Sequence, residues 1–191
     1  MKTSLFLICL LGLSLPLLAQ RLSPFPDSMQ NVLTQYQQLS PQHRFKPITA
    51  DEPGRPLLLM VEIWGRDCDC PLPETAVFMT QTSDAGVYDL SIAGDWASAR
   101  LKGSIQTDPK GRYLIESILP GTYPNSPTAN PHIHLMLESL SQPYYNILFQ
   151  PYLNWYGRRT LVKRGEQHFA ADIWQGPRNQ LIGYVRIYVK S

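Results

Sequence analysis

Two histidines near the middle of the chain, His132 and His134, are separated by a single residue in a largely apolar stretch. Side chains alternate across a β-strand, so both imidazoles would project from one face while Ile133 packs on the other. Two neutral imidazoles on one face form a ready chelate for a metal ion. Because imidazole suits zinc, copper, nickel and iron, the pair alone does not identify the metal.

Two tyrosines are candidates to complete such a site. Tyr88 follows Gly86 by two residues and Tyr123 follows Gly121 by two, so each lies near a point where the backbone can turn sharply. A phenol has a pKa of about 10 in water, yet a bound cation can keep it deprotonated at neutral pH. Phenolate is a hard donor, and two phenolates with two imidazoles would suit ferric iron.

Several short motifs follow one another in a characteristic order. They are Val61-Glu62-Ile63-Trp64, Thr107-Asp108, Gly111-Arg112-Tyr113, residues 118–124 and Pro131-His132-Ile133-His134. Together they resemble the intradiol ring-cleavage dioxygenases, a family that includes the catechol and protocatechuate dioxygenases. The resemblance covers approximately residues 57–153.

This resemblance implies a β-sandwich that binds non-haem ferric iron, Fe(III), through two tyrosines and two histidines. The positions that match these metal ligands are Tyr88, Tyr123, His132 and His134. In the family, the tyrosine equivalent to Tyr123 is displaced when catecholate binds and then serves as a base. Gln150 resembles a glutamine that lines the same site, so Tyr123 and Gln150 are the expected catalytic residues.

The reaction that the resemblance implies is the opening of a catecholic ring with O2. The catechol binds as a dianion, and cleavage between its two hydroxylated carbons gives a muconate-type dicarboxylic acid. One position departs from the family, because Ala129 stands three residues before His132, where an arginine is usual. Another arginine could replace it, and the sequence does not decide between Arg100 and Arg112. The alternative function is a non-catalytic β-sandwich module that binds an aromatic or carbohydrate ligand.

The hydrophobic pattern predicts one helix followed by many short strands. Residues 29–38 have apolar side chains at helical spacing, with Asp27 or Ser28 available as the N-cap. A turn of helix is expected within residues 167–174. Strands are expected at residues 57–64, 76–80, 87–91, 100–106, 112–118, 132–137, 145–153 and 182–189. This pattern predicts an all-β fold, a β-sandwich of mostly antiparallel strands with a short N-terminal helix.

The N-terminus has the features of a secretory signal peptide. Lys2 precedes an apolar run that begins at Leu5 and is short for a membrane span. We expect residues 1–20 to be the signal peptide, residues 21–55 to form the helix and a linker, and residues 56–191 to form the dioxygenase-like domain. The mature protein would then be secreted or periplasmic, without a membrane segment.

Export would place Cys68 and Cys70 in an oxidising compartment. A bridge across the single intervening residue closes a strained ring, so the pair could instead stay reduced, pair between chains or bind metal. The formal charge is +2 without a long basic run, which argues against nucleic acid as a partner. The expected partners are a catecholic small molecule and O2, and the sequence does not specify an oligomeric state.

Overall fold

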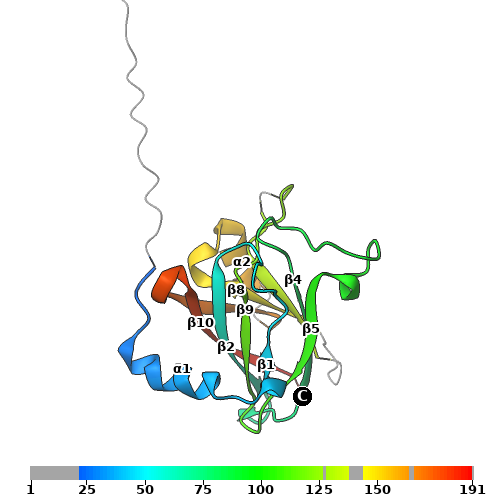
Figure 1. Cartoon of the computed structure of the whole chain (residues 1–191). Coiled ribbons are helices and arrows are strands. Elements are labelled where there is room, and N and C mark those ends of the chain that lie inside the picture. The colour runs from blue at the N-terminus through cyan, green and yellow to red at the C-terminus, as the bar shows by residue number, and fades with distance from the viewer. Residues whose placement is uncertain (1–21, 127, 138–143, 164–165, 191) are drawn as a thin grey trace, which may run out of the picture.

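Strands dominate the structure, a computed structural model that describes residues 22–126, 128–137, 144–163 and 166–190. The described residues form ten strands and two α-helices (Figure 1). The helices are α1 (Gln30–Gln37) and α2 (Trp155–Lys163). The strands are β1 (Arg44–Phe45), β2 (Pro56–Gly65), β3 (Cys70–Pro71), β4 (Ala76–Gln81), β5 (Leu101–Gln106), β6 (Arg112–Ile118), β7 (His132–Met136), β8 (Tyr144–Phe149), β9 (His168–Gln175) and β10 (Leu181–Val189).

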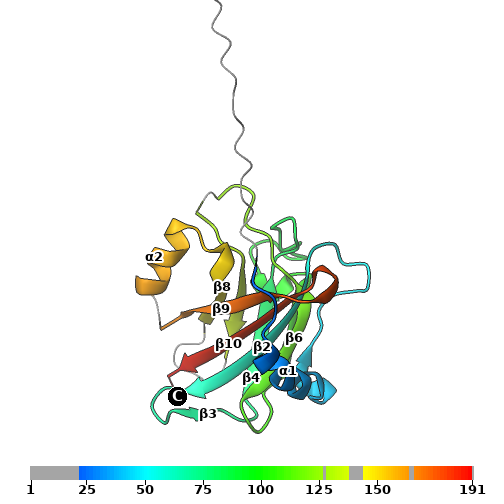
Figure 2. The same ribbon diagram turned by 90° about the vertical axis from the view of Figure 1, so that its left-hand side faces the viewer.

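The strands follow one hydrogen-bonded path, in the order β1-β6-β2-β10-β9-β8-β7-β4-β5, and β3 pairs with β2. β9 joins the two halves of this path, because residues 168–171 pair with β8 and residues 172–175 pair with β10. Figure 2 shows β2 and β10 running side by side as a parallel pair. The predicted mostly β, mostly antiparallel fold is confirmed. The predicted sandwich is not confirmed, since the path forms one nearly closed sheet.

One large cluster of buried residues joins the two halves of the sheet. β2 contributes Leu59, Val61 and Ile63, and β7 contributes Ile133 and Leu135, each at most 1% exposed. Burial of such a side chain stabilises the fold by about 1.5–3 kcal/mol before the entropy cost. A slip of β7 by one residue would exchange these core residues for the histidines. The core therefore fixes the face of β7 on which His132 and His134 lie.

The predicted N-terminal helix is confirmed as α1, which follows a single 3₁₀ turn (Asp27–Met29). Leu33 and Tyr36 are buried against Met60 of β2 and Leu114 of β6. The predicted cap is wrong, because Met29 occupies the N-cap position of α1 and no side chain caps the helix. Packing of the apolar stripe, rather than a cap, therefore holds this helix.

The predicted strand at residues 87–91 is wrong. The segment instead makes isolated backbone hydrogen bonds, in which Ser83 donates to the Val87 carbonyl and Arg100 donates to the Tyr88 carbonyl. Gly86 and Asp89 adopt positive φ angles of 80° and 48°, which are incompatible with a regular ladder. The chain here is an irregular loop, and its hydrogen bonds fix the position of Tyr88.

The predicted turn of helix within residues 167–174 is also wrong, because this segment is β9. Ala171 and Ile173 alternate into the core at 0% and 5% exposure. The predicted strand at residues 145–153 ends earlier, since β8 stops at Phe149 and Gln150–Tyr152 form a 3₁₀ turn. Pro151 lacks the amide hydrogen that a continuing ladder would need.

Cys68 and Cys70 form a disulfide in the structure, which selects one of the alternatives left open by the sequence. The bridge joins the turn after β2 to Cys70, the first residue of β3, and the intervening Asp69 has a φ angle of 45°. None of the helices among the described residues has the length and apolar character of a membrane span. The expected signal peptide, residues 1–20, lies outside the described residues.

Candidate functional site

Strand β7 presents both predicted histidines on the same side. Ile133 and Leu135 are buried in the core, whereas His132 and His134 are partly exposed on the opposite face. Their rings are perpendicular, with centroids 4.5 Å apart, and their Nε2 atoms lie 3.1 Å from one another. The two imidazoles that were expected to bind a metal ion together therefore lie side by side.

Both predicted tyrosines reach this pair. The Tyr123 hydroxyl lies 3.0 Å from His132 Nε2 and 2.9 Å from the Tyr88 hydroxyl. The Tyr88 ring stacks toward His134, with centroids 6.1 Å apart. Four candidate donor atoms from three separate segments thus follow one another at 2.9–3.1 Å.

Two glycines bring the tyrosine loops together. A Cβ atom on Gly121 would lie 2.2 Å from the Asp84 carbonyl oxygen, and one on Gly86 would lie 1.8 Å from the Thr122 carbonyl oxygen. The Gly121 amide donates to the Ser83 carbonyl at 2.8 Å across the same contact. The two backbones touch where side chains are absent, and this contact sets the separation of Tyr88 and Tyr123.

The orientation of His132 depends on the loop before β7. His132 Nδ1 lies 2.8 Å from the Asn130 carbonyl, to which it donates as the Nδ1–H tautomer, leaving the Nε2 lone pair toward the tyrosines. The Asn130 side chain is itself fixed, because its Oδ1 accepts from the Asn154 amide at 2.7 Å. Metal-binding histidines commonly donate their second ring N–H in this way.

Burial keeps the four groups neutral. Burial and the hydrogen bond with Tyr123 raise the pKa of Tyr88, and burial raises the pKa of Tyr123. Burial lowers the pKa of His132, while burial and the nearby His132 lower the pKa of His134 to about 4. A phenolate at this site would therefore need a bound cation to stabilise it.

The three known donor separations are compatible with ligands of one metal ion. Donors about 2.0–2.1 Å from a transition metal, at angles between square and tetrahedral, are separated by about 2.9–3.4 Å. The three consecutive separations of 2.9–3.1 Å lie at the short end of this range. Within the described part of the chain, no three His, Cys, Asp or Glu side chains gather as a metal site, so any centre here depends on the phenols.

Two cavities border the cluster. The larger, of about 590 Å³, is lined by residues that include Trp96, Tyr123 and His134. The smaller, of about 290 Å³, lies against both histidines and against Asn146 and His168, neither of which was expected at the site. No local signal marks Trp96 or Asn146, whereas Asn130 directly precedes the Pro-His-Ile-His motif.

Gln150 and the two candidate arginines, Arg100 and Arg112, line neither of the two cavities beside the cluster. Gln150 is exposed in its 3₁₀ turn and lines neither of these cavities. Arg100 is held by Glu52 at 2.6 Å, and Arg112 is held by Asp108 at 2.7 Å. Among the described residues that line the two cavities there is no arginine, so the position of Ala129 has no substitute there.

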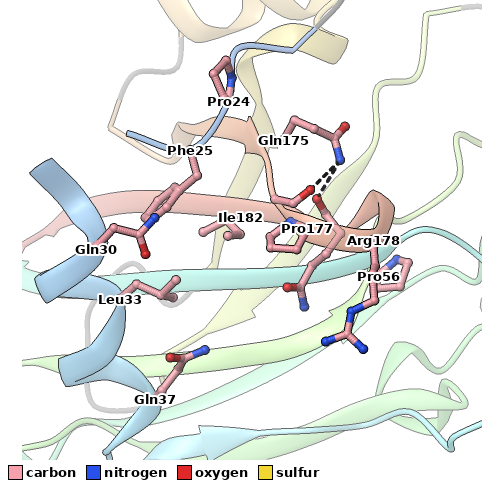
Figure 3. Close-up of a pocket in the computed structure, with 12 residues that line it drawn as sticks. Pro24, Phe25, Gln30, Leu33, Gln37, Pro56, Gln175, Pro177, Arg178 and Ile182 are labelled. Atoms are coloured by element: carbon pink, nitrogen blue, oxygen red, sulfur yellow. Dashed lines mark hydrogen bonds between the residues drawn. The ribbon is translucent and has the colours of Figure 1, made fainter. Parts of the chain in front are cut away.

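A third cavity, of about 690 Å³, lies between α1 and the turn that follows β9 (Figure 3). Phe25 and Leu33 form part of its apolar surface. The Gln175 amide is already committed to the carbonyls of Gly176 and Gln180, at 2.9 and 3.3 Å. None of the described residues lining it is an acid, histidine or tyrosine, so the Tyr-His cluster remains the better candidate for chemistry.

Comparison with solved structures shows a common fold. The dioxygenase domain of a dioxygenase–carbohydrate-binding protein fusion from Streptomyces sp. SirexAA-E aligns over 88% of this chain and 99% of its own, with 20% identity and a TM-score of 0.54. The 3-chlorocatechol 1,2-dioxygenase of Rhodococcus opacus 1CP aligns over 78% of this chain and 64% of its own, with 18% identity and a TM-score of 0.56.

An intradiol ring-cleavage dioxygenase from Tetranychus urticae aligns over 77% of this chain and 86% of its own, with 17% identity and a TM-score of 0.54. No curated protein matches the sequence significantly. The family model described as Dioxygenase matches residues 33–190. The resemblance seen in the motifs is confirmed, and the chain belongs to the dioxygenase family whose fold is that of the intradiol enzymes.

Proposed function

We propose that the protein is an intradiol dioxygenase that holds ferric iron through Tyr88, Tyr123, His132 and His134. The observation that supports this proposal is the succession of four donor atoms at 2.9–3.1 Å. Two phenols and two imidazoles form a mixed hard and borderline donor set that suits Fe(III) better than a divalent ion. The family supports ring cleavage, and the metal and the catecholic substrate are the proposed additions.

The proposed reaction joins one catechol and one O2. The carbon–carbon bond between the hydroxylated carbons and the O–O bond both break, and each oxygen atom forms a new bond to one of these carbons. The product is a muconate-type dicarboxylic acid that contains both oxygen atoms, so the ring carbons are oxidised and O2 is reduced. When bound, ferric iron would supply a Lewis-acidic centre that accepts electron density from the catecholate.

Tyr123 has a second role in this proposal. Its hydroxyl contacts both Tyr88 and His132, so it lies at the middle of the donor set. Burial raises the pKa of Tyr123, and a phenolate released from a cation in this site would be a strong base. Tyr123 would therefore take a proton from a catechol hydroxyl as the substrate binds.

The lack of an arginine among the described residues that line the two cavities should lower the rate. A cation near the reacting ring carbon would stabilise negative charge that develops there, and Ala129 cannot do so. A second candidate function follows from the same position, since a site that binds a catechol without cleaving it would be a binding module. Oxygen consumption separates the two functions, because a binding module would retain the ligand without uptake of O2.

The test is oxygen uptake and product analysis with iron-loaded protein. We expect catechol to give one equivalent of a muconate-type acid for each O2, and Tyr123→Phe or His134→Ala to abolish turnover. Tyr188→Phe is the control, because Tyr188 lies on β10 beside Trp64. Turnover that persists in both site variants would refute the assignment.

We also propose that the protein is exported by its N-terminal segment. The apolar run after Lys2 supports this proposal. N-terminal sequencing of protein recovered from the medium or periplasm would test it. Recovery of a chain that still begins at Met1 from the cytoplasm would overturn it.

A further inference from the structure

The larger cavity beside the Tyr-His cluster has a floor set by strand register. Across β4 and β7, Thr80 pairs with His134 and Phe78 pairs with Met136, and Met136 in turn pairs with Tyr144 of β8. All five side chains line the cavity. Residues two apart in a strand lie about 7 Å apart on one face. The row Phe78–Met136–Tyr144 therefore lies about 7 Å from His134 along the same face of the sheet.

Trp96 forms a wall of the same cavity. Its ring meets Tyr88 edge-on, with centroids 4.5 Å apart, and meets His134 with centroids 5.6 Å apart. It lies in the 3₁₀ turn Trp96–Ser98 and is 51% exposed. Tyr144, at the other end of the floor, is 66% exposed. The partly exposed rings of Trp96 and Tyr144 thus border the apolar floor of the cavity.

The cavity is large for a plain catechol. Its volume of about 590 Å³ falls in the range of about 300–1,000 Å³ that holds drug-sized ligands. A catechol is a single ring with two hydroxyls, and with those hydroxyls at His134 and Tyr123 it would leave the row Phe78–Met136–Tyr144 uncovered. A substituent on the ring would extend over that row and remove its apolar surface from water.

The charge of the lining restricts the substituent. Asp95 is the one charged group among the described lining residues, and its Oδ1 accepts from the Ala97 amide. Lys102 of β5 pairs with Thr80 of β4 and so lies near the cavity. Its ammonium donates to the Ala97 carbonyl, and Lys102 does not line the cavity. A carboxylated substituent would therefore find no counter-ion among the described lining residues and would face the like charge of Asp95.

We propose, building on the proposed function, that the preferred substrates are catechols with a bulky, uncharged, apolar substituent. The substituent lies on Phe78, Met136 and Tyr144 and contacts Trp96, while the diol is directed to the Tyr-His cluster. One methylene in a hydrophobic pocket changes kcat/KM by about ten-fold or more. Discrimination in favour of such substrates should be at least of this size.

The experiment compares kcat/KM for catechol, tert-butylcatechol and protocatechuate with iron-loaded protein. We expect tert-butylcatechol to exceed catechol by about ten-fold or more, and protocatechuate to be the poorest of the three. Tyr144→Ala should lower the ratio of tert-butylcatechol to catechol by several-fold, whereas Trp155→Ala, at an exposed ring outside the cavity lining, should leave it unchanged. Asp95→Asn keeps an oxygen for the Ala97 amide and should raise the relative use of protocatechuate.

Failure of this inference differs from failure of the proposed function. If the protein turns over catechol or protocatechuate as efficiently as tert-butylcatechol, the inference is overturned and the proposed ring cleavage still stands. If no catechol is turned over, the proposed function fails, and calorimetry on the same protein without O2 decides the inference. Tighter binding of tert-butylcatechol than of catechol, weakened by Tyr144→Ala, would support it, and equal binding would overturn it.

Discussion

Asn130→Ala tests the residues that hold the candidate site in place without changing any of the four candidate ligands. Asn130 is 7% exposed and precedes β7 by two residues. Its Oδ1 accepts from the Asn154 amide at 2.7 Å, and its Nδ2 donates to the Thr128 carbonyl at 3.2 Å. A Cβ on Gly157 would lie 2.6 Å from that Nδ2, so α2 packs directly on the Asn130 amide.

The magnitude follows from these contacts. Loss of Oδ1 leaves the Asn154 amide without its acceptor, at a cost of about 1–3 kcal/mol, and loss of the Nδ2 bond adds about 1 kcal/mol. We expect the free energy of unfolding to fall by about 2–4 kcal/mol, which lowers the Tm by about 5–15 °C. The Asn130 carbonyl that orients His132 would also become mobile, so iron affinity should fall by about 10–100-fold.

Two measurements check this prediction: urea unfolding of the metal-free protein and competition with a chelator for iron. Asn125→Ala is the matched control, because Asn125 is exposed in the same loop and its replacement should change stability by less than about 0.5 kcal/mol. An Asn130→Ala protein with unchanged stability and unchanged iron affinity would refute the reasoning.

Two further predictions concern the loops and the histidines. Gly121→Ala should separate the tyrosine loops, because its Cβ would lie 2.2 Å from the Asp84 carbonyl oxygen. We expect this variant to lose iron binding, measured by competition with a chelator. Retained iron binding would contradict the proposed contact. The metal-free protein should lose stability as pH falls from about 6.5 to about 4, because His134 stays neutral in the folded state while the unfolded chain takes up a proton. Urea midpoints across this interval measure the effect, His134→Gln should reduce it, and a flat profile in the parent protein would contradict the burial of His134.

Much of the fold follows from alternation in the sequence. The strands at β2, β6, β7 and β10 were predictable because their apolar runs are bounded by turn residues. β9 was not, because Asp172 interrupts its pattern and its two halves pair with different strands. Tertiary pairing, rather than local preference, decides its conformation.

The sequence pointed to the four candidate ligands, Tyr88, Tyr123, His132 and His134, but not to the way in which they come together. His132 and His134 share a face for a local reason, since side chains alternate along a strand. Tyr88 meets Tyr123 through a backbone contact at Gly86 and Gly121 that no local pattern encodes. Trp96 and Asn146 join the site from distant segments for the same reason. Gln150 remains a prediction that no described contact supports.

Visible absorption of the iron-loaded protein tests the central claim most directly. Phenolate bound to Fe(III) gives a charge-transfer band, so we expect a coloured protein that binds one iron per chain. Tyr88→Phe and Tyr123→Phe should each weaken or shift the band, and Tyr188→Phe should leave it unchanged. A protein that remains colourless after loading with ferric iron would contradict the proposed centre.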